Sequence, residues 1–262
     1  MGETNFYAPG LFCWDELRTR SAAAAKRFYT ELLGWTAVDQ EMPGGMGTYT
    51  ILQAEGKDQA GLCELSGPRF QGVPSHWMSF VAVADADATT RRALALGAEV
   101  LREAMDVPGV GRMVYLKDPT GASFELYQAG GHRGAAKLEG RPGSFCWHEL
   151  MTGDTKKATD FYSALFGWKA NFMNMGAMDY TTWMQGTEAV GGMMAITREM
   201  GPVPPNWLPY IAVGDCDGSV KRARDMGATV IVPPRDVPAV GRFATLMDPS
   251  GAAISIIQLA GA

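Results

Sequence analysis

FCWDELRTRSAAAAKRFYTELLGW, residues 12–35, decides the fold because both of its ends return later in the chain. FCWDEL at 12–17 returns as FCWHEL at 145–150. FYTELLGW, at the end of the stretch, returns as FYSALFGW at 161–168. Such self-similarity at long range is the signature of a duplicated architecture. The sequence therefore predicts two domains built on one plan.

The later part of each half repeats as well. DVPGVGR at 106–112 returns as DVPAVGR at 236–242, and the residues that follow are similar up to 128 and 258. Both copies contain Asp-Pro-x-Gly, which is typical of a β-turn with proline in its second position. The repeat therefore extends through the whole of each half.

A segment rich in glycine and small residues separates the two halves. AGGHRGAAKLEGRPG, residues 129–143, has the composition of a flexible, solvated connection. We expect a first domain over residues 1–130, a linker over 131–143 and a second domain over 144–262.

The hydrophobic pattern of the first half alternates between strand and helix. LFCWDEL is a short apolar run typical of a strand, and the next segment begins at a plausible cap, Ser21. Phe28, Leu32 and Leu33 follow at helical spacing before Gly34. Three strand-like runs come next, over 36–42, 48–54 and 60–65. This order is one βαβββ unit.

The same order returns within each half. In the first half it is a strand over 77–85, a helix over 86–97, and strands over 98–106, 111–118 and 122–128. Each half therefore holds two βαβββ units and the chain holds four. This predicts an α+β fold.

Composition and charge exclude several classes of partner. The chain has 262 residues, a net charge of −5 and no basic run, so neither nucleic acid nor an anionic membrane surface is expected as a partner. No segment approaches the roughly 18 apolar residues of a membrane span, and the N-terminus has no secretory pattern. We expect a cytoplasmic protein. Four cysteines without a CxxC pair predict buried structural thiols.

Paired βαβββ units, the FYxxLxGW helix end and the DPxGxxxE pattern of the last hairpin resemble the vicinal-oxygen-chelate superfamily. This superfamily includes glyoxalase I, the bleomycin- and fosfomycin-resistance proteins and the extradiol dioxygenases. The W-x-E-L pattern of the first strand resembles that of two-domain glyoxalase-like proteins of bacteria. The resemblance implies that the two units of each domain form a cupped mixed sheet around a small-molecule ligand. It does not imply one activity, because a shared scaffold hosts many.

In catalytic members of that superfamily, His and Glu side chains in the cup bind a divalent metal. Such a metal needs three or four converging N or O donors. At the six corresponding positions this chain has Trp14, Met78 and Glu125 in the first half, and Trp147, Leu208 and Ser255 in the second. Only Glu125 is a suitable donor, and the triad of an extradiol dioxygenase cannot be assembled. We therefore predict no cofactor, with a divalent metal as the alternative.

Polar residues two positions from these sites offer another arrangement, because residues two apart on a strand share a face. The first half then has Glu16, His76 and Glu125 as a displaced metal site or an acid–base cluster. The second half has Glu149, Asn206 and Ser255. The alternative is structural: Glu16 and Glu149 bond to neighbouring backbone, and His76 lies at a loop edge. His148 is adjacent to Glu149 and is expected on the outer face or between domains.

Aromatic and methionine side chains are candidates for lining a ligand site. Trp14 and Trp147 offer flat rings that could stack on a planar ligand. The middle strands of the second half are rich in soft side chains, which suit either an adaptable apolar site or an ordinary core. These are Phe172, Met173, Met175, Met178, Tyr180, Trp183, Met184, Met193 and Met194.

Three functions are compatible with these features. The first is a metal-free binding protein that holds a small, partly apolar or aromatic molecule in one or both cups, at Trp14, Met78, Trp147, Glu149, Leu208 and Ser255. The second is a glyoxalase-like lyase acting on a reactive carbonyl such as methylglyoxal, with Glu125, Glu16 and His76 as catalytic candidates. The third is an interaction module whose cups are filled by side chains. We expect the protein to be a monomer or a homodimer.

Overall fold

The computed structural model describes residues 7–42, 47–138, 140–174 and 179–261, and within them four βαβββ modules follow one another as predicted. The first module contains β1 (Phe12–Thr19), α1 (Ala22–Leu33), β2 (Thr36–Glu41), β3 (Thr48–Ala54) and β4 (Lys57–Glu64). The second contains β5 (His76–Ala82), α2 (Ala86–Ala95), β6 (Glu99–Val107), β7 (Gly111–Lys117) and β8 (Ser123–Ala129).

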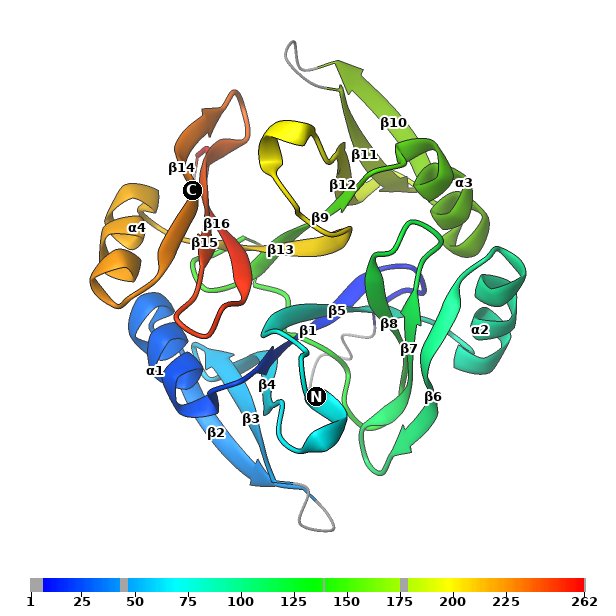
Figure 1. Cartoon of the computed structure of the whole chain (residues 1–262), viewed down its shortest axis with the longest axis horizontal. Helices are drawn as coiled ribbons and strands as arrows, with labels where there is room; N and C mark the ends of the chain where they lie inside the picture. Colours follow the sequence, from blue (N-terminus) through cyan, green and yellow to red (C-terminus); the bar gives the residue numbers. More distant parts are fainter. Residues whose placement is uncertain (1–6, 43–46, 139, 175–178, 262) are drawn as a thin grey trace. The chain divides into compact units, whose positions relative to one another are not determined.

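The second half repeats this order (Figure 1). The third module contains β9 (Phe145–Thr152), α3 (Thr155–Phe166), β10 (Lys169–Asn174), β11 (Asp179–Gln185) and β12 (Glu188–Ala195). The fourth contains β13 (Asn206–Ala212), α4 (Cys216–Asp225), β14 (Thr229–Val237), β15 (Gly241–Met247) and β16 (Ala253–Leu259). Short 3₁₀ turns, Pro68–Phe70 and Arg198–Met200, precede β5 and β13.

The strands of each half form one mixed sheet of eight. The order is β2-β3-β4-β1-β5-β8-β7-β6 in the first half and β10-β11-β12-β9-β13-β16-β15-β14 in the second. Within a module, the first strand pairs in parallel with the last one, as β1 does with β4 and β5 with β8, and the remaining pairs are antiparallel. This confirms the predicted α+β class with cupped mixed sheets.

The repeated Gly-Trp pair ends the first helix of each half. Gly34 after α1 and Gly167 after α3 are left-handed, with φ of 68° and 75°, a conformation that glycine adopts without strain. Ser21 occupies the predicted capping position of α1, yet its side chain makes no capping hydrogen bond. At α3, Asp154 does cap, since its carboxylate accepts from the backbone N–H of Lys157.

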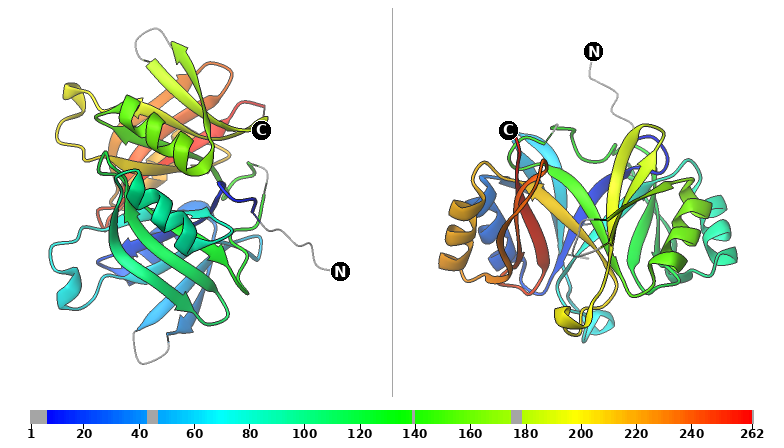
Figure 2. Two further views of the ribbon diagram at one scale, coloured as in Figure 1. Left: turned by 90° about the vertical axis from the view of Figure 1, so that its right-hand side faces the viewer. Right: turned by 90° about the horizontal axis from the view of Figure 1, so that it is seen from above.

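The elements pack into two compact units that each combine modules from both halves. Unit 1 contains the described parts of residues 1–13, 79–134 and 147–208, and unit 2 contains residues 14–78, 135–146 and 209–262. In unit 1 the helices α2 and α3 are in contact, and in unit 2 α1 contacts α4. Each helix also covers strands of its own module, as α4 covers β14, β15 and β16 (Figure 2). The apolar core of each unit is therefore shared between the two sequence halves.

The repeated motifs meet in the core of each unit through a buried chain of hydrogen bonds. In unit 2 the indole of Trp77 donates to the hydroxyl of Tyr29 (2.9 Å), which donates to Asp248 (3.0 Å). Unit 1 repeats the chain with Trp207, Tyr162 and Asp118, at 2.8 Å for both bonds. The aspartate of the Asp-Pro turn in one half is thus bonded to the tyrosine of the FY pair in the other.

Asp118 and Asp248 also form the predicted turns. One carboxylate oxygen of Asp118 accepts from the backbone N–H groups of residues 120, 121 and 122, and Asp248 accepts from those of residues 250 and 252. Several donors on one carboxylate satisfy a buried charge that would otherwise be costly. These aspartates are structural in this fold.

Part of the segment 129–143, which was expected to be a flexible, solvated connection, is packed against the rest of the protein. Leu138 is buried in the core of unit 2, with 1% of its surface exposed. The backbone N–H of Ala136 donates to Asp58, and the indole of Trp35 donates to the carbonyl of Gly143. The composition of the segment did not reveal this packing, because glycines of the segment take part in backbone hydrogen bonds. The domain limits predicted around this segment stay a prediction.

All four cysteines are free thiols, two of them buried, in line with the prediction from their spacing. Burial raises the pKa of Cys146 to about 12 and that of Cys216 to about 11, so neither is an effective nucleophile at neutral pH. None of the helices in the described part of the chain is long and apolar enough to cross a membrane.

Candidate functional site

The alternation of β1 separates two faces. Leu17 belongs to the apolar core under the helices, so Trp14 and Glu16 lie on the opposite face. Gly61 of β4 stands beside Glu16 in the register. The side chains of the two predicted positions, 14 and 16, therefore share one face of the sheet.

Four side chains of unit 2 form a hydrogen-bonded cluster on that face, which we call the first Trp-Tyr-Glu cluster. The indole of Trp14 donates to the hydroxyl of Tyr49 (3.2 Å), and Tyr49 donates to the carboxylate of Glu16 (3.0 Å). Arg18 donates to the same carboxylate (2.8 Å), in an ion pair whose side chains are 10% and 12% exposed. The thiol of Cys63 lies 3.7 Å from it.

Burial raises the pKa of Tyr49 well above its ordinary value, and the charge of Glu16 raises it further. The phenol therefore stays protonated at neutral pH and acts as a donor. The partners of Glu16 in this cluster are the side chains of Tyr49, Arg18 and Cys63.

A glycine makes room for the tyrosine. A Cβ atom on Gly61 would overlap the hydroxyl of Tyr49, so the ring lies in the space that a side chain at 61 would fill. The second half has the same arrangement, with Gly192 paired to Glu149 and Tyr180 lying over it.

The second Trp-Tyr-Glu cluster lies in unit 1. The indole of Trp147 donates to Tyr180 (2.9 Å), which donates to Glu149 (2.9 Å). Burial and the charge of Glu149 raise the pKa of Tyr180 far above its ordinary value. Arg18 has no counterpart here, because Met151 takes its place. Trp14 is buried, whereas Trp147 is half-buried and so more accessible.

His76, at the start of β5, belongs to unit 2 with Glu16. Its Nδ1 donates to the carbonyl of Pro74 (2.9 Å), and its buried Nε2 has no hydrogen-bond partner among the described residues. Burial lowers the pKa of His76, Arg18 lowers it slightly more, and the bond to Pro74 and the charge of Glu16 act in the opposite direction. Asn206 makes the equivalent bond to Pro204 in the second half (2.8 Å).

Met78 and Leu208, which follow these residues by two, are buried, with 2% and 6% of their surfaces exposed. The remaining predicted residue of the first half, Glu125, lies in unit 1 and is completely buried. Its carboxylate accepts two bonds from the guanidinium of Arg102, at 2.8 and 3.1 Å. Its counterpart Ser255 is bonded to Thr245 (2.9 Å) in unit 2.

These side chains do not match the metal site of the catalytic relatives. Trp14, Met78, Trp147 and Leu208 carry no suitable donor atom. Glu125 is bonded to a guanidinium, and among the described residues no three His, Cys, Asp or Glu side chains come together as a metal ligand set. The residues do not fit the divalent metal that the family implies.

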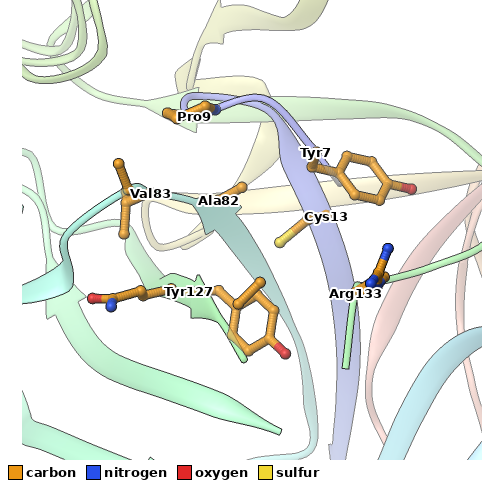
Figure 3. Close-up of a pocket in the computed structure, with 10 residues that line it drawn as sticks. Tyr7, Pro9, Cys13, Ala82, Val83, Tyr127 and Arg133 are labelled. Carbon is orange, nitrogen blue, oxygen red and sulfur yellow. The ribbon is translucent and has the colours of Figure 1, made fainter. Parts of the chain in front are cut away.

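Two hollows open on unit 1. The smaller, of about 250 Å³, is lined by Tyr7, Cys13, Tyr127 and Arg133 among others (Figure 3). The larger, of about 480 Å³, is bordered by Phe172, Met173, Met193 and Tyr180 of the second cluster. Phe172 is 70% exposed there. Met175 and Met178 lie outside the described residues.

His148 lies at the second of its two expected places, between the two predicted domains. Its ring is buried, with 7% exposed, and stacks on Phe12 of unit 1 with centroids 4.0 Å apart and planes 13° apart. It is therefore not on an outer face. Its position is set by packing that joins the two halves of the sequence.

Tyr49 and Arg102 were missed by reasoning on the sequence, and Tyr180 was named only among the side chains that could line a ligand site. The two tyrosines are equivalent in the repeat: each stands near the start of the second strand after the first helix of its half, and each ring lies over a glycine of the next strand. Arg102 has no equivalent in the repeat, since Val232 stands at its place in the second half.

Comparison with known proteins fits this structure. The chain is 37% identical over 259 residues, covering 98% of both chains, to the protein named "Putative glyoxylase CFP32" of Mycobacterium bovis. It is also 37% identical over 267 residues to the anthracycline biosynthesis protein DnrV of Streptomyces peucetius, covering 97% of this chain and 94% of that one.

Among solved structures, the Mn(II)-bound glyoxalase of Novosphingobium aromaticivorans matches with a TM-score of 0.65 at 17% identity, covering 95% of this chain and 82% of that one. The 2,3-dioxygenase LapB of Pseudomonas sp. KL28 matches with a TM-score of 0.63 at 14% identity, covering 96% and 93%. These likenesses show the fold. The model of the glyoxalase/bleomycin resistance protein/dioxygenase superfamily matches residues 13–126 and 145–256. The chain therefore belongs to this superfamily.

Proposed function

We propose that this chain is a cytoplasmic, metal-free binding protein for a small, partly aromatic molecule, held at the Trp-Tyr-Glu clusters. The observation that carries the proposal is the occurrence of the same cluster in both halves. Each cluster combines an aromatic surface with a buried carboxylate and a tyrosine hydroxyl. Ligand sites are commonly mostly apolar with a few placed polar groups.

The second cluster offers the more accessible surface. Trp147 is half-buried where Trp14 is buried, and the half-buried Met194 lies beside Tyr180 in the register. Methionine and aromatic side chains adapt to varied apolar shapes. The relative named for anthracycline biosynthesis supports a fused aromatic ring system as the ligand class.

Titration with 1,4-dihydroxyanthraquinone, followed by quenching of tryptophan fluorescence, tests this proposal. We expect saturable binding that Glu149→Gln and Glu16→Gln each weaken by about tenfold at their own site, as expected for loss of a charge-assisted hydrogen bond. Glu103→Gln, an exposed glutamate of β6, is the matched control and should bind as the native chain does. Absence of binding to this probe and to related planar phenols would overturn the proposal.

Metal analysis of the tag-free protein tests the second part of the proposal. We expect less than stoichiometric divalent metal after purification in metal-supplemented medium, since four of the six family ligand positions are Trp, Met or Leu. The metal-free assignment would be wrong if the protein held one equivalent of metal and if removing this metal with a chelator also abolished ligand binding.

A glyoxalase-like lyase is the second candidate. It is favoured by the buried carboxylates of Glu16 and Glu125 and by the name of the mycobacterial relative. A carboxylate can abstract the proton alpha to a carbonyl as a general base. The test is turnover of the methylglyoxal–thiol adduct by the native chain and by Glu125→Gln and Glu16→Gln. Loss of turnover in either variant would favour the lyase. Turnover that neither substitution changes would exclude these two carboxylates as the base.

A further inference from the structure

One rung of the sheet in unit 1 carries an ion pair. Neighbouring residues in the register lie side by side on one face, here in the order Phe80, Glu125, Tyr115 and Arg102 across β5, β8, β7 and β6. The residues that alternate with them, such as Leu116 and Leu126, form the apolar core beneath helix α2. The rung therefore faces away from that core.

The two charged ends of the pair differ in exposure. The side chain of Glu125 is 0% exposed and that of Arg102 is 41% exposed. A single guanidinium nitrogen, Nη2, donates to both carboxylate oxygens. In the described part of the chain, Nε and Nη1 of Arg102 have no recorded acceptor. Glu125 thus orients the guanidinium of Arg102 through Nη2, and leaves the N–H groups of Nε and Nη1 available to a ligand.

The second half has lost both members of this pair together. Val232 stands at the place of Arg102, and Ser255 at that of Glu125, where it bonds to Thr245. The nearest arginine on that strand, Arg235, lies over the ring of Phe243, 6.0 Å from its centroid, and none of the described carboxylates forms an ion pair with it. A buried carboxylate that has lost its cationic partner destabilises the fold, so the two residues are expected to be kept or lost together.

We propose that Arg102, oriented by Glu125, is an oxyanion-binding subsite specific to the first half, and that it takes the carboxylate of an aromatic acid. This rests on the proposed binding function and names the ligand class. A planar guanidinium with free N–H groups matches a carboxylate in shape and charge. Tyr115, half-buried beside it on the rung, supplies an aromatic surface for the ligand ring.

The experiment compares two probes that differ only in charge. Anthraquinone-2-carboxylate and anthraquinone-2-carboxamide are titrated at pH 7.5 into the full chain and followed by calorimetry. We expect the acid to bind about tenfold more tightly than the amide, and Arg102→Gln to reduce this ratio to about one. Arg102→Lys should keep part of the preference for the acid, because the positive charge remains but the planar guanidinium with its paired N–H donors does not.

Two further variants make the outcome decisive. Arg102→Gln leaves Glu125 unpaired and could disturb folding, so the double substitution Arg102→Val with Glu125→Ser installs the pair of residues found in the second half. It should fold and show no preference for the acid. Arg235→Gln is the matched control and should preserve the preference.

A preference for the acid that survives the double substitution, or that Arg235→Gln removes, would overturn the assignment. Equal binding of both probes to the native chain would also overturn it, while leaving the proposed binding function intact. If neither probe binds, the subsite assignment is overturned, and the titration with 1,4-dihydroxyanthraquinone shows whether the binding function fails with it.

Discussion

At the scale of single residues, the side chains near the family's ligand positions are engaged with one another. Glu16 is held by Tyr49 and Arg18, and Glu125 by Arg102. A carboxylate that already accepts from a phenol and a guanidinium is oriented before a ligand arrives. This preorganisation favours selective binding of a polar group, because little ordering is left to occur.

His76 provides a residue-level prediction about pH. Burial lowers its pKa in the folded state, so the unfolded chain binds the proton more readily. Its contribution to stability is complete above about pH 6.5 and is lost as the pH falls below that value towards the lower folded pKa. His76→Asn copies Asn206, which makes the equivalent backbone bond. Urea unfolding measures the free energy of unfolding at pH 7.5 and 5.5. Between these two pH values the variant should lose less stability than the native chain. An equal loss in both proteins would contradict this prediction.

At the scale of elements, the glycines of β4 and β12 decide where the tyrosines lie. A Cβ atom at Gly61 or Gly192 would overlap the hydroxyl of the facing tyrosine. Strand glycines often mark such close approach. The sequence around each, AGLCE and VGGMM, shows an apolar strand but not which ring will cover it.

Gly61→Ala should therefore destabilise the fold by about 1–3 kcal/mol, the usual cost of overpacking. It should also displace Tyr49 from Glu16 and weaken ligand binding at the first cluster. Gly153→Ala is the control, because a Cβ atom there has no neighbour within 4 Å. The measurement is the urea midpoint of both variants. A Gly61→Ala protein as stable as the control would show that the ring is not confined by this strand.

At the scale of the whole molecule, the duplication is a requirement of packing. Each unit takes its core from both halves, with α1 against α4 in one and α2 against α3 in the other. The chains Trp77–Tyr29–Asp248 and Trp207–Tyr162–Asp118 connect motifs that belong to different halves. Neither half contains a complete core.

We therefore expect residues 1–134 and 135–262, expressed separately, to be unfolded or self-associated, because each leaves apolar helix-packing surfaces uncovered. Mixed together, they should form a one-to-one complex with the helical content of the intact chain. Light scattering coupled to size exclusion, with circular dichroism, measures both properties. A single half that is monomeric and as stable as the intact chain would refute this.

The sequence by itself determined the order of the elements. Four βαβββ modules, the ends of α1 and α3 at glycine and the Asp-Pro turns all follow from patterns within short segments. Periodicity also placed Trp14 and Glu16 on one face. It did not reveal the burial of Leu138 in the connecting segment, which depends on segments distant in sequence.

Only the tertiary structure decided which faces meet and which partners each polar side chain has. A period of two or 3.6 residues fixes the direction of a side chain but not the element opposite it. The bonds of Tyr49 to Glu16, of Arg102 to Glu125 and of Tyr29 to Asp248 all join residues distant in the sequence. They form because burying the shared cores of the two units brings these strands and helices together, and each buried charge then needs a partner.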